Sequence, residues 1–321
     1  MDIRRLDDLP PDYLDAYTAA VADRPGPPVF RADVEWQLRN GPTGATSEIW
    51  AALDGDAVLG GFALFFSHLD NPRKAYVYEL FVHPAHRRRG IGGALFTRAR
   101  AAVRAAGRSL VVGESPASGG SRAFVEAMGC EIVLPEARRT LDLRTLDWDA
   151  VRAAAPAHDG YRLERFASPA PEELLPDLVL LMNGMNDAPR GGDLEEEHYD
   201  LDRVREIEQV VSRRGWDTLG VLARRESDDA VAGLTRLGVR ADGADTWAYQ
   251  ADTVVLPGHR GHRLGLALKL DNLWSLRERV PHAEQVITWN ATSNRHMLAI
   301  NEAMGFRLLD EWETWQVSLQ R

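Results

Sequence analysis

One sequence pattern occurs twice in this chain, at matching places in two similar halves. The first copy reads HPAHRRRGIGGAL over residues 83–95, and the second reads LPGHRGHRLGLAL over residues 256–268. Pro257 follows Pro84 by 173 positions. The segment EAMGF at 302–306 corresponds to EAMGC at 126–130. The chain has 321 residues, which suits two domains of about 150 residues each. The repeat therefore predicts two copies of one fold.

The repeated segment has the chemistry of an anion-binding loop. An apolar stretch at 76–82 is followed by a proline, a basic turn and Gly-x-Gly at the start of a predicted helix. Such a helix start gathers unpaired backbone N–H groups and the positive end of the helix dipole. Gly90 and Gly92 let the backbone approach a diphosphate closely, and the arginines at 87–89 add charged donors. Leu95 replaces the third glycine of a dinucleotide-binding loop, and the Gly-Lys-Ser/Thr ending of a Walker loop is missing.

The first loop resembles the signature of the GNAT superfamily of acyl-CoA-dependent N-acyltransferases, Arg/Gln-x-x-Gly-x-Gly/Ala. Residues 87–92 match this signature fully, whereas residues 260–265 have Arg263 in place of the first glycine. The two-half layout resembles that of tandem-domain GNAT proteins. The resemblance implies an α/β (α+β) fold, with two tandem GNAT-like domains, each a mixed, mostly antiparallel sheet flanked by helices. It also implies that the fourth and fifth strands of each sheet splay apart.

The predicted domains are residues 1–146 and 161–321, joined by a linker at 147–160 that is rich in Ala, Asp and Pro. The second domain is expected to repeat the order of elements in the first. In the first domain, periodicity and turn residues predict strands at 3–6, 48–53, 57–67, 75–83 and 109–113, helices at 11–22, 32–39, 90–106 and 119–128, and closing strands over 130–143.

The resemblance implies acetyl-CoA as the co-substrate. We expect no metal ion, because the His-x-x-His pairs at 83–86 and 259–262 have no carboxylate or thiolate of suitable spacing nearby. The residues expected to hold acetyl-CoA in the first half are Phe81, Val82, His83, Arg87, Arg88, Arg89, Gly90, Ile91, Gly92 and Gly93. The second half offers an alternative cofactor site, made of Val254, Val255, Arg260, Arg263, Gly265, Asn290 and Asn294. We favour the first half because Arg263 replaces the residue that should admit phosphate. The second half stays open, since it is the catalytic one in a tandem enzyme of this layout.

Acyl transfer to an amine needs a held thioester, a deprotonated amine and a stabilised oxyanion. Glu79 lies on the predicted strand just before the first loop and is the candidate base, and Asp252 is its alternative in the second half. Many GNAT enzymes use a tyrosine to protonate the leaving thiolate. The corresponding positions here hold Val125 and Asn301.

Two functions follow from these residues. The first is an acetyl-CoA-dependent N-acetyltransferase that transfers the acyl group to a primary amine of a small molecule, by direct attack of the amine on the thioester. The alternative is a non-catalytic acyl-CoA-binding or sensing protein with degenerate transferase domains.

Composition narrows the choice of partners. The formal net charge of −10 argues against nucleic acid as a partner and favours a cationic partner such as an amine. The acidic run at 193–200 lies in a region that, in GNAT proteins, covers the acceptor, although a solvated acidic loop is the simpler explanation.

The chain has no apolar run of about 18 residues and no signal-like start. We therefore expect a soluble cytoplasmic protein without membrane contact, either monomer or homodimer.

Overall fold

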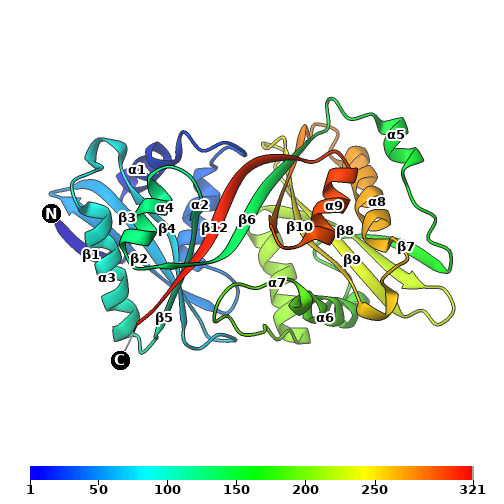
Figure 1. Ribbon diagram of the computed structural model, residues 1–321, viewed down its shortest axis with the longest axis horizontal. Helices are drawn as coiled ribbons and strands as arrows, with labels where there is room; N and C mark the ends of the chain where they lie inside the picture. Colours follow the sequence, from blue (N-terminus) through cyan, green and yellow to red (C-terminus); the bar gives the residue numbers. More distant parts are fainter. Residues whose placement is uncertain (320–321) are drawn as a thin grey trace. The chain divides into compact units, whose positions relative to one another are not determined.

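The computed structural model describes residues 1–319, whose elements follow the same order in both halves of the chain (Figure 1). The first half contains β1 (Asp2–Leu6), α1 (Pro11–Val21), α2 (Arg31–Asn40), β2 (Ala45–Asp54), β3 (Ala57–Ser67), β4 (Lys74–Val82), α3 (Ile91–Ala105), β5 (Leu110–Pro116), α4 (Gly120–Ala127) and β6 (Glu131–Asp142). The second half contains β7 (Tyr161–Ala167), α6 (Leu175–Gly184), α7 (Leu201–Arg213), β8 (Trp216–Arg225), β9 (Val231–Arg240), β10 (Trp247–Val255), α8 (Leu264–Arg279), β11 (Gln285–Ala291), α9 (Arg295–Ala303) and β12 (Arg307–Ser318). The predicted duplication and fold class are confirmed.

Hydrogen bonds connect the strands in the order β1-β2-β3-β4-β5-β12-β6-β11-β10-β9-β8-β7. The pairs β4–β5 and β10–β11 are parallel, and the neighbouring pairs β3–β4, β5–β12 and β9–β10 are antiparallel. The sheet is therefore mixed and mostly antiparallel. None of the helices within residues 1–319 is long and apolar enough to cross a membrane.

The compact units of the protein are not continuous in sequence. Unit 1 comprises residues 1–136, 190–196 and 311–321, and unit 2 comprises residues 137–189 and 197–310. In unit 1, β12 pairs with β5 in antiparallel fashion, from Trp312 opposite Pro116 to Ser318 opposite Leu110. The predicted segments 1–146 and 161–321 follow the repeat in the sequence, whereas unit 1 takes its last strand from the second half. The free edge of β5 explains this arrangement, because an unpaired strand edge needs a hydrogen-bonding partner.

The predicted linker at 147–160 contains a short helix, α5 (Trp148–Ala153). Asp147 caps this helix, since its side chain accepts hydrogen bonds from the amides of Asp149 and Ala150. Val151 is buried in a cluster of unit 2, and Trp148 packs against the same cluster. The segment is therefore attached to unit 2 by its apolar side chains.

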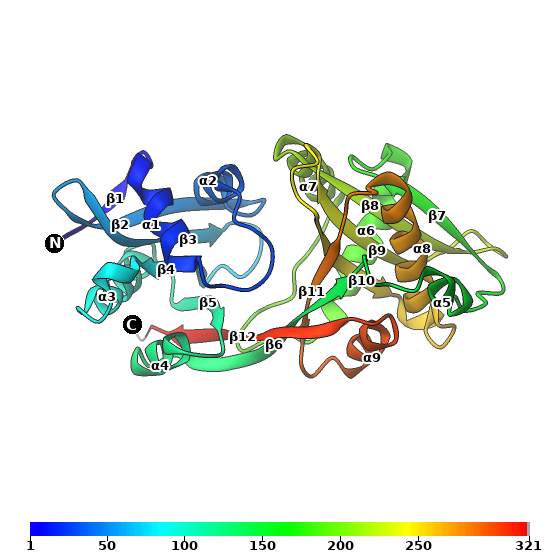
Figure 2. The ribbon, with the colours of Figure 1, turned by 90° about the horizontal axis from the view of Figure 1, so that it is seen from above.

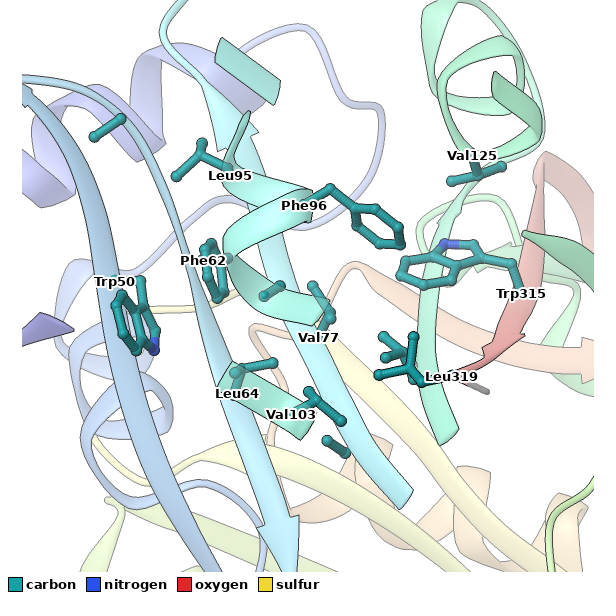
Figure 3. Close-up of a cluster of buried hydrophobic side chains, with 14 of the residues drawn as sticks. Trp50, Phe62, Leu64, Val77, Leu95, Phe96, Val103, Val125, Trp315 and Leu319 are labelled. Atoms are coloured by element: carbon teal, nitrogen blue, oxygen red, sulfur yellow. The ribbon is translucent and has the colours of Figure 1, made fainter. Parts of the chain in front are cut away.

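Helices cover both faces of the sheet of unit 1 (Figure 2), and an apolar cluster lies on each face. Alternating side chains of β2 and β3 pack against α1 and α2 on one face and against α3 and α4 on the other. On the second face, Trp315 of β12 meets Phe96 of α3 at a ring-centroid distance of 5.8 Å, with Val125 and Leu319 beside it (Figure 3). The end of the chain is therefore part of the core of unit 1.

Trp315 provides a test of the contribution of β12 to unit 1. Its side chain is 4% exposed, and truncation of such a residue costs about 3 to 5 kcal/mol. We expect Trp315→Ala to lower the midpoint of urea unfolding, followed by far-UV circular dichroism. Leu308→Ala is the control, because Leu308 lies on the same strand but is 55% exposed. Equal losses in both variants would contradict the packing described for β12.

Unit 2 buries a lysine at the position that Phe96 occupies in unit 1. Lys269 of α8 is 2% exposed, and its Nζ donates a hydrogen bond of 2.7 Å to Oδ1 of Asn301. The Nζ also lies 5.4 Å from the centroid of the Phe306 ring. Burial lowers the pKa of Lys269 from 10.5 to about 7. The unfolded chain therefore binds more protons than the folded chain between these two values, and stability rises with pH across that window.

We expect the free energy of unfolding to increase by about 2 kcal/mol between pH 7 and pH 9 in the wild type relative to Lys269→Met. The variant removes the desolvated ammonium, so it also melts at a higher temperature at pH 7 than the wild type. Lys74→Met, on β4, serves as the control and is expected to keep the pH dependence of the wild type. Parallel stability curves for the wild type and Lys269→Met would rule out a buried ammonium.

Candidate active site

The first loop connects β4 to α3 through the single turn Pro84–His86. Gly90 precedes α3 with a φ of 79°, and Arg88 has a φ of 62°, so the chain turns sharply at two left-handed positions. No side chain caps α3. The first amides of the helix, from Ile91 to Gly93, are therefore available to an anion at the positive end of the helix dipole.

The arginines of this loop have different tasks. Arg87 holds the loop in place, because its Nε donates to the carbonyl of Val82 at 3.2 Å and its Nη2 to the carbonyl of Ala20 at 2.8 Å. Arg88 and Arg89 are exposed. Arg87, which was predicted to bind phosphate, therefore stabilises the loop itself. Arg88 and Arg89 place positive charge near the start of the helix.

The histidines of the loop are also engaged locally. The Nδ1 of His83 accepts a hydrogen bond of 3.3 Å from the amide of Ala85, and His86 lies 3.1 Å from Nη1 of Arg89. Within residues 1–319, no group of three or more His, Cys, Asp or Glu side chains is placed to hold a metal ion.

The second loop repeats the backbone of the first. Arg263 precedes α8 in the left-handed region with a φ of 55°, and Gly261 has a φ of 89°. Arg260 braces this loop through the carbonyl of Val255 at 3.0 Å and through Asp187 at 2.8 Å. A left-handed arginine costs about 1 to 2 kcal/mol. A Cβ at Gly90 would meet no atom within 4 Å, so the loop has open space for a side chain at this position.

The predicted splaying of the fourth and fifth strands is present in both units. The parallel pairs of β4 and β5 end at Val77 opposite Gly113, although β4 continues to Val82 and β5 to Pro116. In unit 2 the corresponding pairs end at Gln250 opposite Thr288. We call the separation of β4 and β5 the fork. Beyond Val77 and Gly113 the two strands are no longer paired with each other, and the anion loop directly follows the β4 arm.

Glu79 lies in a β-bulge of β4 at the fork. Glu79 and Leu80 together oppose the single residue Phe62 of β3, and Glu79 has a φ of 48°. The bulge places Glu79 beside Arg24, in the turn that follows α1, and Nη1 of Arg24 donates to both of its carboxylate oxygens, at 3.2 and 2.9 Å. Burial, followed by the charge of Glu79, raises the pKa of Tyr17 above its usual range. The predicted base is therefore at the fork but is held in an ion pair.

A second carboxylate at the fork, Glu114, was not predicted from the sequence. It is the first β5 residue beyond the last β4–β5 pair and lies opposite Thr314 of β12. Tyr76 of β4 lies beside Glu114, and Glu136 of β6 lies close enough to repel its charge. Desolvation, followed by the charge of Glu136, raises the pKa of Glu114 to about 7. A signal was available in the sequence, since Glu114 directly ends the apolar run at 110–113.

In unit 2, Asp252 occupies the bulge position of Glu79. Ala251 and Asp252 oppose Arg236 of β9, and the guanidinium of Arg236 binds Asp252 through Nε at 3.2 Å and Oε1 of Glu208 through Nη1 at 3.0 Å. Arg236 and Glu208 are both buried. Asp252, the alternative base, is thus one carboxylate of a buried ion network.

The two asparagines of the alternative site have partners within unit 2. Asn290 accepts a hydrogen bond of 2.7 Å from Asn301, whose own Oδ1 faces Lys269. Asn294 caps α9 by accepting from the amide of Met297 at 3.2 Å. Asn301 stands at the position of the tyrosine of many GNAT enzymes, but it is fully buried in this chain of hydrogen bonds.

A segment from the second half belongs to unit 1. Oε1 of Gln316 accepts a hydrogen bond of 3.0 Å from the amide of Asp193, and Oδ1 of Asn71 accepts one of 2.7 Å from the amide of Glu195. The beginning of the predicted acidic run at 193–200 is therefore attached to β12 and to the turn before β4.

Comparison with known proteins agrees with this architecture. Residues 45–129 match the family described as Acetyltransferase (GNAT) domain, a range that contains β4, the first loop, α3 and β5. Over 263 residues the chain is 28% identical to a mycothiol acetyltransferase from Saccharomonospora viridis, a match that covers 76% of each chain.

Two solved structures cover nearly the whole chain. A tandem GNAT protein from the clavulanic acid biosynthesis pathway is 27% identical, with a TM-score of 0.83 over 100% of this chain and 99% of the other. A GCN5-related N-acetyltransferase from Sphaerobacter thermophilus is 16% identical, with a TM-score of 0.74 over 99% and 96% of the two chains, and it supports the fold alone. The chain thus contains a GNAT acetyltransferase domain at residues 45–129, has the fold of a tandem GNAT protein, and is distantly homologous to mycothiol acetyltransferase.

Proposed function

We propose that unit 1 transfers an acetyl group from acetyl-CoA to a primary amine of a small molecule. The observation that carries this proposal is the uncapped start of α3, which lies directly after the strand that forms one arm of the fork. The diphosphate of CoA meets the amides of residues 91–93 and the charges of Arg88 and Arg89. The pantetheine arm then reaches the unpaired backbone of β4, which leads the thioester toward Glu79 and Glu114.

The chemistry needs few further groups. The amine attacks the thioester carbonyl directly, and free N–H groups of β4 at the fork stabilise the oxyanion. A carboxylate at the fork takes the proton of the ammonium group, either Glu79, predicted from the sequence, or Glu114. Val125 is buried and cannot protonate the thiolate, so the leaving group departs without a tyrosine acid.

The second unit serves as a scaffold in this proposal. Its candidate base, Asp252, is hydrogen-bonded to Arg236. The position of the tyrosine that acts as the acid in many GNAT enzymes holds the buried Asn301. The second half of the chain also supplies residues 190–196 and the end of β12 to unit 1. The acidic side chains of Asp193 and Glu195 support a cationic acceptor, in line with the net charge of −10.

Release of free thiol from acetyl-CoA, followed with a thiol reagent across a panel of primary amines, tests the proposed activity. We expect release that depends on at least one amine and saturates with it, because both substrates must be bound. Binding of acetyl-CoA by calorimetry without amine-dependent release would instead support the alternative of a non-catalytic acyl-CoA-binding or sensing protein.

Gly90→Asp tests the position of the cofactor. The variant places a negative charge where we locate the diphosphate, and a Cβ there meets no protein atom within 4 Å. We therefore expect acetyl-CoA affinity to fall by about tenfold or more while the fold is kept. Gly107→Asp is the matched control, because Gly107 follows the other end of α3, also has a positive φ, and has equal space. Unchanged affinity in Gly90→Asp would remove the cofactor from the first loop.

A further inference from the structure

Two carboxylates face the fork, and their surroundings differ. Both oxygens of Glu79 accept from Arg24, whose guanidinium also lies 5.6 Å from the centroid of the Trp312 ring. A charge-assisted pair of this kind stabilises the carboxylate and occupies the lone pairs that would receive a proton. Glu79 would have to leave Arg24 before it could accept a proton from an amine.

Glu114 has no cationic partner among the described residues. Its neighbours at the fork are Tyr76 and Glu79 from β4, Glu136 from β6 and Thr314 from β12. Thr314 donates a hydrogen bond of 2.8 Å to Glu136, which itself forms no ion pair within residues 1–319. Tyr76 lies beside Glu114, and it keeps its proton because burial, followed by the charge of Glu114, holds its pKa well above the usual range.

The location of Glu114 also suits contact with a thioester. It is the first residue on β5 after the two strands separate, and its side chain is accessible to solvent. A reactant lying between the strands would therefore meet an accessible carboxylate at the base of the fork.

We propose that Glu114, rather than Glu79, accepts the proton of the acceptor amine, an inference that rests on the acetyltransferase function proposed for unit 1. Glu79 and Arg24 act as a fixed ion pair that shapes the acceptor side of the fork. The raised pKa of Glu114 supports this assignment, since a base is most effective when its pKa lies near the working pH.

The proton balance of the reaction is complete with this one carboxylate. The ammonium group of the acceptor gives a proton to Glu114, and the neutral amine attacks the carbonyl carbon to form the N–C bond. The C–S bond then breaks, and the CoA thiolate receives the second N–H proton through solvent. Glu114 returns its own proton to water after the amide product leaves.

Glu114→Gln is the decisive variant, because glutamine keeps the shape and polarity of the side chain but cannot take a proton. We expect kcat/KM to fall by about 10² to 10⁴ and the loss of activity below pH 7 to disappear. Glu136→Gln removes a neighbouring negative charge, so it is expected to move that acid limb to lower pH. Glu131→Gln is the control, since Glu131 is an exposed carboxylate at the start of the same strand as Glu136.

Acetyl-CoA affinity and melting temperature, measured on each variant, identify a folding or binding defect. Full kcat/KM in Glu114→Gln, beside an active wild type, would overturn the assignment while leaving the proposed function intact. The assignment also fails if Glu79→Gln, and not Glu114→Gln, abolishes the acid limb. A wild type that binds acetyl-CoA but releases no thiol with any amine would overturn both the assignment and the proposed function.

Discussion

The fork between β4 and β5 governs both the packing and the proposed chemistry of unit 1. Two parallel strands share hydrogen bonds over only four positions, from Lys74 opposite Leu110 to Val77 opposite Gly113, and then separate. On its other edge β5 pairs with β12. The β4 arm of the fork leads directly into the anion loop. The core of the unit and its proposed site are thus built on the same two strands.

The bulge in β4 is the second device that shapes this site. Without the extra residue, alternation along the strand would direct Glu79 to the face that packs on α3. The inserted position instead places Glu79 beside Arg24 and Phe81 beside Tyr13 and Tyr17. Unit 2 repeats the bulge with Asp252 opposite Arg236. The backbone of the repeat was preserved in both units, while the charges around it were arranged differently.

The two units diverge in what their side chains permit. Phe96 in unit 1 packs against Trp315, whereas the corresponding Lys269 in unit 2 is buried beside Asn301. Arg263 adopts the left-handed conformation of Gly90 with little change in the loop. The loops of the two halves therefore have similar backbones. The halves differ mainly in their side chains. This supports unit 1 as the catalytic unit and unit 2 as its support.

Local signals along the chain were enough to predict the duplication, the order of elements and the anion loop. Apolar periodicity, the Gly-x-Gly pattern and the repeated motifs can each be recognised from residues that are close together in sequence. The position of Glu79 at the fork also followed from its distance to the loop. The pairing of Arg24 with Glu79, the bracing of the loop by Arg87, and the contacts of Glu114 with Tyr76 and Glu136 emerged only in the folded protein. These contacts join residues far apart in the chain, through a bulge and a strand taken from the second half, and no local pattern records such long-range pairing.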